Sequence, residues 1–293
     1  MQNEWWQHPL LFLIENNVTD CYLSCAMQTK NISNQTNMTH PDPLVDIHTI
    51  PRPIVAMAKD FPSGYVISIH EHSRAQLLYA SSGVMTVKTD SGIWVVPPLR
   101  AVWIPAYTRH EIEVSGNLAM RTLYIDPTYY TGPSDRCSVM AVSPLLKELI
   151  LYAVGLPRLY PLVGQEERLF KVLLDQISNM KTAPLELQIP TDIRLRKIYA
   201  HLSNNPGDNR TLEDWGKKVG ATGRTLARHF RSETGMSFAQ WRQQIRILEA
   251  LKRLGMKESV TAVAIELGYD SPSAFISMFK KTVGKTPGQY FAE

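Results

Sequence analysis

The sequence contains little cysteine and no long apolar run, and each shortage excludes a class of protein. The three cysteines among 293 residues are Cys21, Cys25 and Cys137. Their number is odd, and the Cys-x3-Cys pair lacks the further ligands of a zinc site, so we expect free thiols. The longest early apolar stretch, residues 10–14, is much shorter than the ~20 residues of a membrane span. No basic segment precedes it, as one would in a signal peptide. We therefore expect a cytoplasmic protein without a membrane partner.

Charge is divided unevenly along the chain. Residues 1–190 contain 14 Lys and Arg against 17 Asp and Glu, whereas residues 191–293 contain 17 against 10. A positive excess in one half is typical of a domain that binds a polyanion. The composition is 44% hydrophobic and 20% charged, which supplies enough apolar material for two cores without disulfides.

Residues 1–42 are polar, rich in Asn and Thr, and without helical or strand periodicity. Their four Asn-x-Ser/Thr triplets would be glycan acceptors only in a secreted protein. We predict a disordered extension here, and we leave open that Met38 is the natural start of the chain.

Residues 43–130 are predicted to form a β-barrel. Short runs rich in Val, Ile, Tyr and Trp recur between turn residues at a spacing of roughly eight to twelve, which is typical of a sandwich or small barrel. The expected strands are 65–69, 76–80, 84–88, 93–96, 101–104, 111–114 and 120–125.

Residues 131–189 are interpreted as a helical linker and a candidate dimer contact. Ser143 and Pro144 have the residue types of an N-cap and a first helical position. A second helix is expected over about 166–178, with Leu169, Val172, Leu173 and Ile177 on its apolar face. The stretch 182–190, which holds two prolines, is expected to be a connection without regular structure.

An internal repeat lies in residues 190–291, which we predict to be entirely helical. Residues 212–220 match residues 260–268 at an offset of 48, and the offset then becomes 49 because the second copy has one extra turn residue. A repeat indicates one supersecondary unit used twice. We predict two helix-turn-helix units, at about 211–232 and 260–281.

Each copy has the residues that a tight turn between two helices needs. A small residue, Gly216 or Ala264, allows close approach of the helices. A glycine four residues later, Gly220 or Gly268, can take the left-handed conformation that ends the first helix. Between the units, a capping box of Ser237 and Gln240 predicts the start of one long helix. Its apolar stripe comprises Phe238, Trp241, Ile245, Leu248 and Leu254.

These residues resemble the AraC/XylS family of transcription regulators. The second unit carries the family signature in Gly268-Tyr269, Ser273-Ala274-Phe275, Phe279-Lys280-Lys281, Gly284 and Thr286-Pro287. Gly216 departs from the family, which usually has Ala there, and glycine costs about 1 kcal/mol in a helix. The resemblance implies a sequence-specific regulator that binds double-stranded promoter DNA, with RNA polymerase as a partner if it is an activator.

DNA contacts are predicted from the outward residues of the second helix in each unit. Arg224 is the candidate for base readout, because a guanidinium can bond guanine O6 and N7 together. The outward residues of the second unit are short or phosphate-seeking, which indicates positioning. The candidates are Thr222, Gly223, Arg224, Thr225, Arg228 and Arg231 in the first unit and Ser271, Ser273, Ser277 and Lys280 in the second.

His70, His72, Gln76 and His110 form a candidate metal or effector site. Histidines two apart on a strand point to the same face, and imidazole suits Zn, Fe or Ni. The pattern Gly-x5-His-x-His-x3-Gln-x6-Gly resembles the first motif of cupin barrels, with Gln in place of Glu. In metal-binding cupins the matching positions hold one divalent ion. Gln is a weaker ligand than a carboxylate, so a metal site, an effector pocket and a structural cluster all stay open.

The sequence thus predicts an α+β multidomain regulator. An N-terminal cupin-like barrel senses a small-molecule effector, and an all-α domain with two helix-turn-helix units binds DNA. A cupin enzyme with an accessory basic domain is the alternative, but no acid–base or nucleophile constellation supports it. A DNA-organising protein would leave the barrel unexplained. We therefore expect no enzymatic activity, and a homodimer stays open because two DNA-binding units in one chain do not require one.

Overall fold

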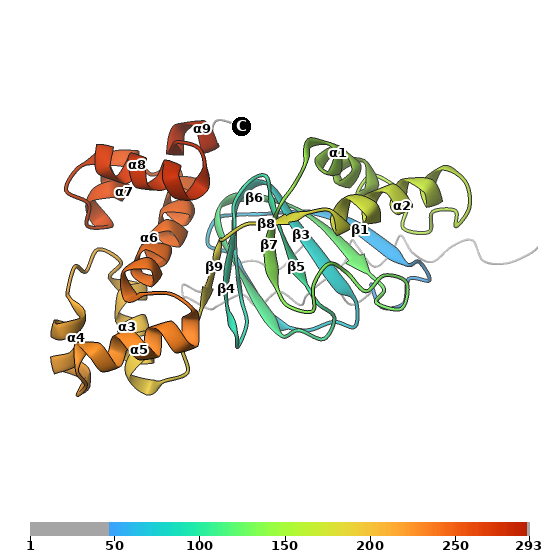
Figure 1. The fold of residues 1–293 in the computed structure, drawn as a ribbon. Coiled ribbons are helices and arrows are strands. Elements are labelled where there is room, and N and C mark those ends of the chain that lie inside the picture. Colours follow the sequence, from blue (N-terminus) through green and yellow to red (C-terminus); the bar gives the residue numbers. More distant parts are fainter. Residues whose placement is uncertain (1–46, 292–293) are drawn as a thin grey trace, which may run out of the picture. The chain divides into compact units, whose positions relative to one another are not determined.

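The computed structural model describes residues 47–291, so the predicted disordered extension over residues 1–42 lies outside the described residues. A sheet-rich N-terminal part is followed by an all-helical C-terminal part (Figure 1). This confirms the predicted fold class. Within the described part of the chain, no helix is long and apolar enough to cross a membrane.

Nine strands of the described chain form one antiparallel sheet, built around two long strands that pair with each other. The first half of β3 pairs with β5 and its second half with β4. Bulges around Ser82 separate the two halves, which turns the sheet and rolls it up. The strands are β1 (Ile54–Phe61), β2 (Val66–His70), β3 (Ala75–Lys88), β4 (Gly92–Val96), β5 (Arg100–Ile104), β6 (His110–Ile125), β7 (Ser138–Ala141), β8 (Lys181–Thr182) and β9 (Glu186–Gln188).

Several strands differ from those expected from the sequence. Two pairs of predicted strands are single strands, β3 and β6. In β3, Gly83 makes a bulge rather than a turn. Its backbone has φ +73°, and an added Cβ would lie 2.7 Å from the carbonyl oxygen of Asn117. Strands β1, β7, β8 and β9 were not predicted. β9 lies in the expected connection 182–190 and pairs with β4, because Leu187 is buried in the core.

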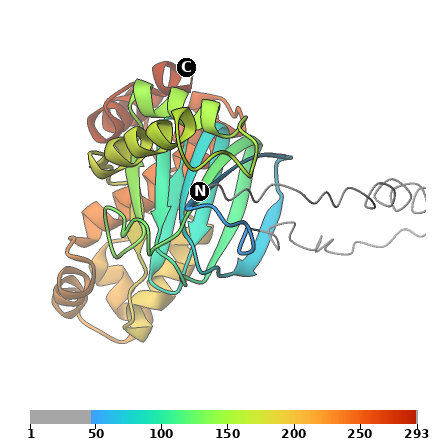
Figure 2. The same cartoon turned by 90° about the vertical axis from the view of Figure 1, so that its right-hand side faces the viewer.

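Two helices, α1 (Pro144–Ala153) and α2 (Gln165–Ser178), cover the outer face of the sheet (Figure 2). Ser143 caps α1 by accepting a hydrogen bond from the Leu146 amide at 3.1 Å, as predicted. The predicted face of α2 was wrong in part, because Val172 is 43% exposed. The buried face is Phe170, Leu173, Leu174 and Ile177.

The C-terminal part consists of helices around one long helix, α6. The bounds are α3 (Ile193–Asn204), α4 (Leu212–Val219), α5 (Gly223–Thr234), α6 (Phe238–Gly255), α7 (Val260–Glu266), α8 (Pro272–Val283) and α9 (Pro287–Phe291). The capping box of Ser237 and Gln240 begins α6, and all five residues of the predicted apolar stripe are buried. The pairs α4–α5 and α7–α8 are the two predicted helix-turn-helix units.

Candidate nucleic-acid interface and sensor site

The turn of the first unit explains why residue 216 is glycine. Gly220 ends α4 in the left-handed region, at φ 71°, and Ala221 then folds back over the helix. The Ala221 amide donates to the carbonyl oxygen of Gly216 at 3.0 Å. A Cβ added at Gly216 would lie 2.4 Å from the carbonyl oxygen of Ala221. The close approach that the sequence predicted is therefore a contact between backbone atoms.

The second unit makes the same turn with one more residue. The Tyr269 amide donates to the carbonyl oxygen of Ala264 at 3.0 Å, and Gly268 has φ +74°. Ser271 then caps α8 by accepting a hydrogen bond from the Ala274 amide. The longer turn accommodates the methyl group of Ala264, which is fully buried.

The outer face of α5 is basic. Leu226 and Phe230 are buried beneath it, whereas Arg224, Arg228 and Arg231 are exposed. Among residues 47–291, none of these three arginines forms an ion pair with a carboxylate. Their charges are therefore available to a polyanion.

The other predicted residues of α5 are occupied by the fold. Thr222 caps the helix by accepting from the Thr225 amide at 3.1 Å, and the two hydroxyl groups lie 2.9 Å apart. Gly223 is partly buried, and a Cβ there would lie 2.7 Å from a carboxylate oxygen of Glu213. These three residues hold the start of α5 and leave contact with DNA mainly to the arginines.

The outer face of α8 carries shorter side chains and fewer charges. Phe275 and Phe279 are buried, and Ser273, Ser277 and Lys280 are exposed on the opposite side. Short hydroxyl groups and a flexible ammonium suit contacts with phosphate oxygens.

Arg246 on α6 is a residue that sequence reasoning missed. It is 8% exposed, and its guanidinium donates to the carbonyl oxygens of Pro206 at 2.9 Å and Asp208 at 3.3 Å. The same group lies 5.5 Å from the ring centroid of Tyr269, at the turn of the second unit. Arg246 thus joins the loop before α4 to the α7–α8 turn. Its place on α6, next to the apolar stripe, gave no signal, because arginines on helices are usually solvent-exposed.

The structure brings the three predicted histidines together. The ring centroids of His70 and His110 are 4.3 Å apart, and those of His72 and His110 are 5.2 Å apart. One ring nitrogen from each histidine lies within 4.8 Å of the other two. β2 and the adjacent loop supply His70 and His72, and the start of β6 supplies His110.

Backbone carbonyl groups fix the tautomer of each histidine. The Nδ1 atoms contact the carbonyl oxygens of Ser68 at 2.8 Å, Arg74 at 2.5 Å and Thr108 at 2.7 Å. Because a carbonyl only accepts, each Nδ1 carries the proton and each Nε2 presents a lone pair. The Nε2 atoms of His70 and His110 are buried and have no partner among the described residues. Metal-ligating histidines in proteins are held in this way.

The fourth predicted residue, Gln76, lies beside the cluster and is 1% exposed. Its Oε1 atom lies 3.1 Å from the Nε2 atom of His72, and its Nε2 atom donates to the Thr122 hydroxyl. With His72 in the tautomer above, two lone pairs face each other across this distance. A cation would relieve that opposition, as would exchange of the amide nitrogen and oxygen.

Burial keeps His72 and His110 uncharged. Burial lowers the pKa of His110 to about 3, and it lowers the pKa of His72 as well. Both are therefore neutral at pH 7, and neutral imidazole is the form that binds metal ions. The donor set of three imidazoles and an amide oxygen fits a divalent transition metal ion. Sequence reasoning missed the neighbour Thr122, because its pairing with Gln76 is non-local.

Known proteins match both parts of this chain. Residues 56–192 match the family model described as AraC-like ligand binding domain, and residues 215–293 match the helix-turn-helix domain. The HTH-type transcriptional regulator NimR of Escherichia coli is 36% identical over 224 residues, which cover 76% of this chain and 82% of that protein. The chain belongs to the AraC/XylS family of transcription regulators. The predicted identity is thus confirmed, and this AraC/XylS regulator is a DNA-binding protein with an N-terminal ligand-binding domain.

Two further proteins are similar to this AraC/XylS regulator. The HTH-type transcriptional regulator RipA of Corynebacterium glutamicum is 28% identical over 74% of this chain and 62% of that protein. The structure of ToxT from Vibrio cholerae is 13% identical, with a TM-score of 0.36, over 82% of this chain and 98% of that one.

Proposed function

We propose that this AraC/XylS regulator reads bases with Arg224 and holds DNA phosphates with the other exposed polar residues of α5 and α8. The proposal rests on the outer face of α5, where Arg224, Arg228 and Arg231 form no ion pair with a carboxylate of residues 47–291. An arginine in the first turn of a recognition helix is placed to reach base edges, because that end of the helix enters the major groove. Arg228 and Arg231 lie further along α5, where contact with the phosphate backbone is expected.

We further propose that the three histidines hold one divalent ion, Zn, Fe or Ni. The three convergent Nε2 lone pairs support this, because two of them are buried without any partner among residues 47–291. His70, His72 and His110 would be the ligands, and Gln76 would lie beside them. A bound ion would supply a Lewis-acidic centre inside the sensor domain.

Elemental analysis of the purified regulator tests the metal proposal. We expect about one ion per chain in the native protein and a loss of at least about tenfold in His72→Ala and in His110→Ala. His48→Ala is the matched control, because His48 lies outside the cluster and is expected to leave the metal content unchanged. Equal metal content in all four proteins, or none in the native protein, would overturn the proposal.

We propose that the regulator acts in the cytoplasm, that it responds to a small-molecule effector in its sensor domain, and that it is not an enzyme. RNA polymerase is its partner if it activates transcription. We also propose a homodimer contact on α1, where Leu145 and Tyr152 are each 53% exposed. They border a groove that α2 completes with Leu169.

A further inference from the structure

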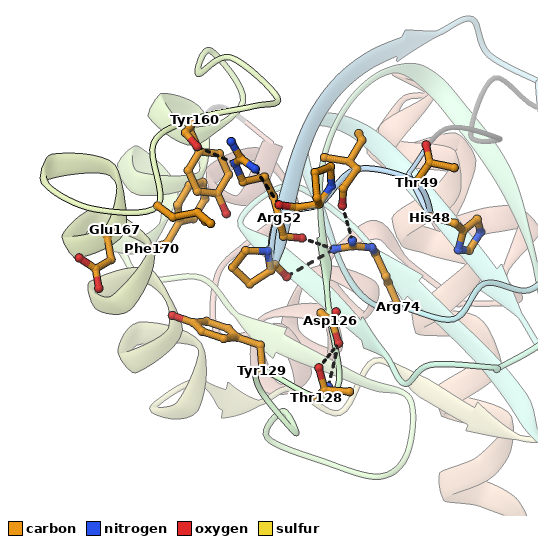
Figure 3. A pocket seen from close by; sticks show the side chains of 14 residues that line it. His48, Thr49, Arg52, Arg74, Asp126, Thr128, Tyr129, Tyr160, Glu167 and Phe170 are labelled. Carbon is orange, nitrogen blue, oxygen red and sulfur yellow. Dashed lines mark hydrogen bonds between the residues drawn. The ribbon is translucent and has the colours of Figure 1, made fainter. Parts of the chain in front are cut away.

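A second pocket lies in the sensor domain, outside the histidine cluster. Its volume is about 610 Å³, which is in the range of small-molecule sites. Its wall combines the loop before β1, the start of β3, the loop after β6, the α1–α2 loop and the first turns of α2 (Figure 3). We call it the outer pocket and define it by Arg52, Arg74, Tyr129, Tyr160, Glu167 and Phe170.

Two guanidinium groups are held rigidly at this pocket. Arg74 is 7% exposed and donates to the carbonyl oxygens of Ile50 at 2.9 Å and Arg52 at 2.7 Å. The Arg52 side chain donates to the carbonyl oxygens of Tyr160 at 2.6 Å and Leu159 at 3.2 Å. Such backbone partners fix the orientation of both groups and carry no net charge.

The positive charge of the two arginines is only partly offset nearby. Neither forms an ion pair with a carboxylate of the described residues, although the charge of Asp126 acts on Arg74. Burial lowers the pKa of Arg74, but a guanidinium stays protonated at pH 7. Because two cations face one nearby carboxylate and the hydrogen-bond partners of both are neutral, an anion in the pocket would stabilise this arrangement.

Two carboxylates limit how much negative charge the pocket can accept. Asp126 accepts hydrogen bonds from the amide and hydroxyl of Thr128, at 2.9 and 2.7 Å, and these bonds hold the pKa of Asp126 below its usual range. Glu167 pairs with Lys171 at 2.7 Å. Both are therefore ionised at pH 7, and a ligand with a second negative charge would be repelled by them. A monoanion fits best.

Aromatic rings also line the pocket. The ring centroids of Tyr160 and Phe170 are 4.5 Å apart, and the Arg52 guanidinium lies 5.6 Å from the Tyr160 ring centroid. Tyr160 and Phe170 are each 3% exposed, whereas Tyr129 is 47% exposed at the rim. Figure 3 shows Arg74 on one side of the view and Tyr160 and Phe170 on the other. The exposed ring of Tyr129 offers a flat apolar surface, which favours a ligand with an aromatic body.

We propose that the outer pocket binds an aromatic monocarboxylate, with its carboxylate toward Arg52 and Arg74 and its ring against Tyr129. The inference rests on the proposed effector response and gives the effector a place and a chemical class. It is independent of the metal proposal. The two sites are adjacent, because the Nδ1 atom of His72 contacts the backbone carbonyl of Arg74.

Isothermal titration calorimetry on the full-length regulator tests the ligand class with three probes of one shape. Biphenyl-4-carboxylate is expected to bind at least about tenfold more tightly than its neutral amide, because only the acid carries the charge that the arginines lack. Biphenyl-4,4′-dicarboxylate is expected to bind at least about tenfold more weakly than the monoacid. An amide that binds as tightly as the acid, or an acid that does not bind at millimolar concentration, would overturn the proposal.

Variants test the location. Arg52→Gln is expected to weaken binding of the acid about tenfold and to leave binding of the amide within about twofold. Tyr129→Ala, at the exposed rim, is expected to weaken both probes alike, and it decides the location if Arg52→Gln does not fold. His110→Ala should lose the metal ion and keep binding of the acid. Loss of acid binding in His110→Ala, or native affinity in both Arg52→Gln and Tyr129→Ala, would refute the outer pocket while leaving the metal result standing.

Discussion

Gly216 occupies a position where helix propensity and packing oppose each other. Alanine is the better helix former by about 1 kcal/mol, so propensity alone predicts that Gly216→Ala stabilises the protein. A methyl group there would press on the carbonyl oxygen of Ala221, 2.4 Å away, and backbone atoms move only with their whole turn. We expect Gly216→Ala to lower the free energy of unfolding by about 1–2 kcal/mol, measured by urea denaturation. Ala264→Gly in the longer second turn is the control, with a loss of about 1 kcal/mol from propensity and about 1 kcal/mol more from its buried methyl group. Increased stability of Gly216→Ala would show that the turn shifts and accommodates the methyl group.

Arg224 and Arg231 lie on the same helix and should differ in what they recognise. Arg224→Ala is expected to reduce discrimination between the promoter and unrelated DNA by about 1–3 kcal/mol, because a bidentate contact with guanine is lost. Arg231→Ala is expected to weaken binding to all sequences alike and to reduce the dependence of log K on log salt by about one. Competition binding at several salt concentrations measures both effects. A uniform loss in Arg224→Ala would reassign that residue to a phosphate.

At the scale of elements, the features that depend only on residues close in the sequence were predictable. The caps at Ser143, Ser237 and Thr222 are local, because each side chain bonds to an amide within the next turn. β9 depends on a partner strand about 90 residues away, so a stretch with two prolines resembled a simple connection. The histidine cluster had a local signal in its spacing. The outer pocket had none, since it combines five segments.

Arg246 connects elements that are far apart in the sequence, because it joins α6 to the loop before α4 and to the α7–α8 turn. Arg246→Met keeps an unbranched apolar stem but is shorter, and it leaves the carbonyl groups of Pro206 and Asp208 without their donors. We expect the free energy of unfolding to fall by about 2–3 kcal/mol, measured by urea denaturation. Affinity for DNA should fall as well, since the α7–α8 turn loses its contact with Arg246 through Tyr269. Lys252→Met on the same helix removes only a partly exposed ion pair with Glu249 and should cost less than about 1 kcal/mol. Equal losses in the two variants would show that the contacts of Arg246 contribute no more to stability than the ion pair of Lys252 does.

At the scale of the whole molecule, the exposed apolar residues of α1 determine whether one chain or two chains bind a promoter. A patch of this kind on one chain can pair with the same patch on a second chain about a twofold axis. We expect the native regulator to sediment near twice its chain mass of 33.2 kDa. Leu145→Glu should sediment as a monomer, because the twofold axis would bring two buried carboxylates together.

The matched control for the dimer is Leu159→Glu, which changes a leucine that is 62% exposed and lies outside the groove. It should leave the mass unchanged. The two variants also separate assembly from recognition, since each chain keeps both helix-turn-helix units. Leu145→Glu should therefore bind a single half-site with native affinity and lose affinity only for a promoter with two half-sites, where linkage raises the effective concentration. A dimer that survives Leu145→Glu would place the contact elsewhere. A monomeric native protein would show that there is no dimer contact, and promoter binding would then depend on the two units within one chain.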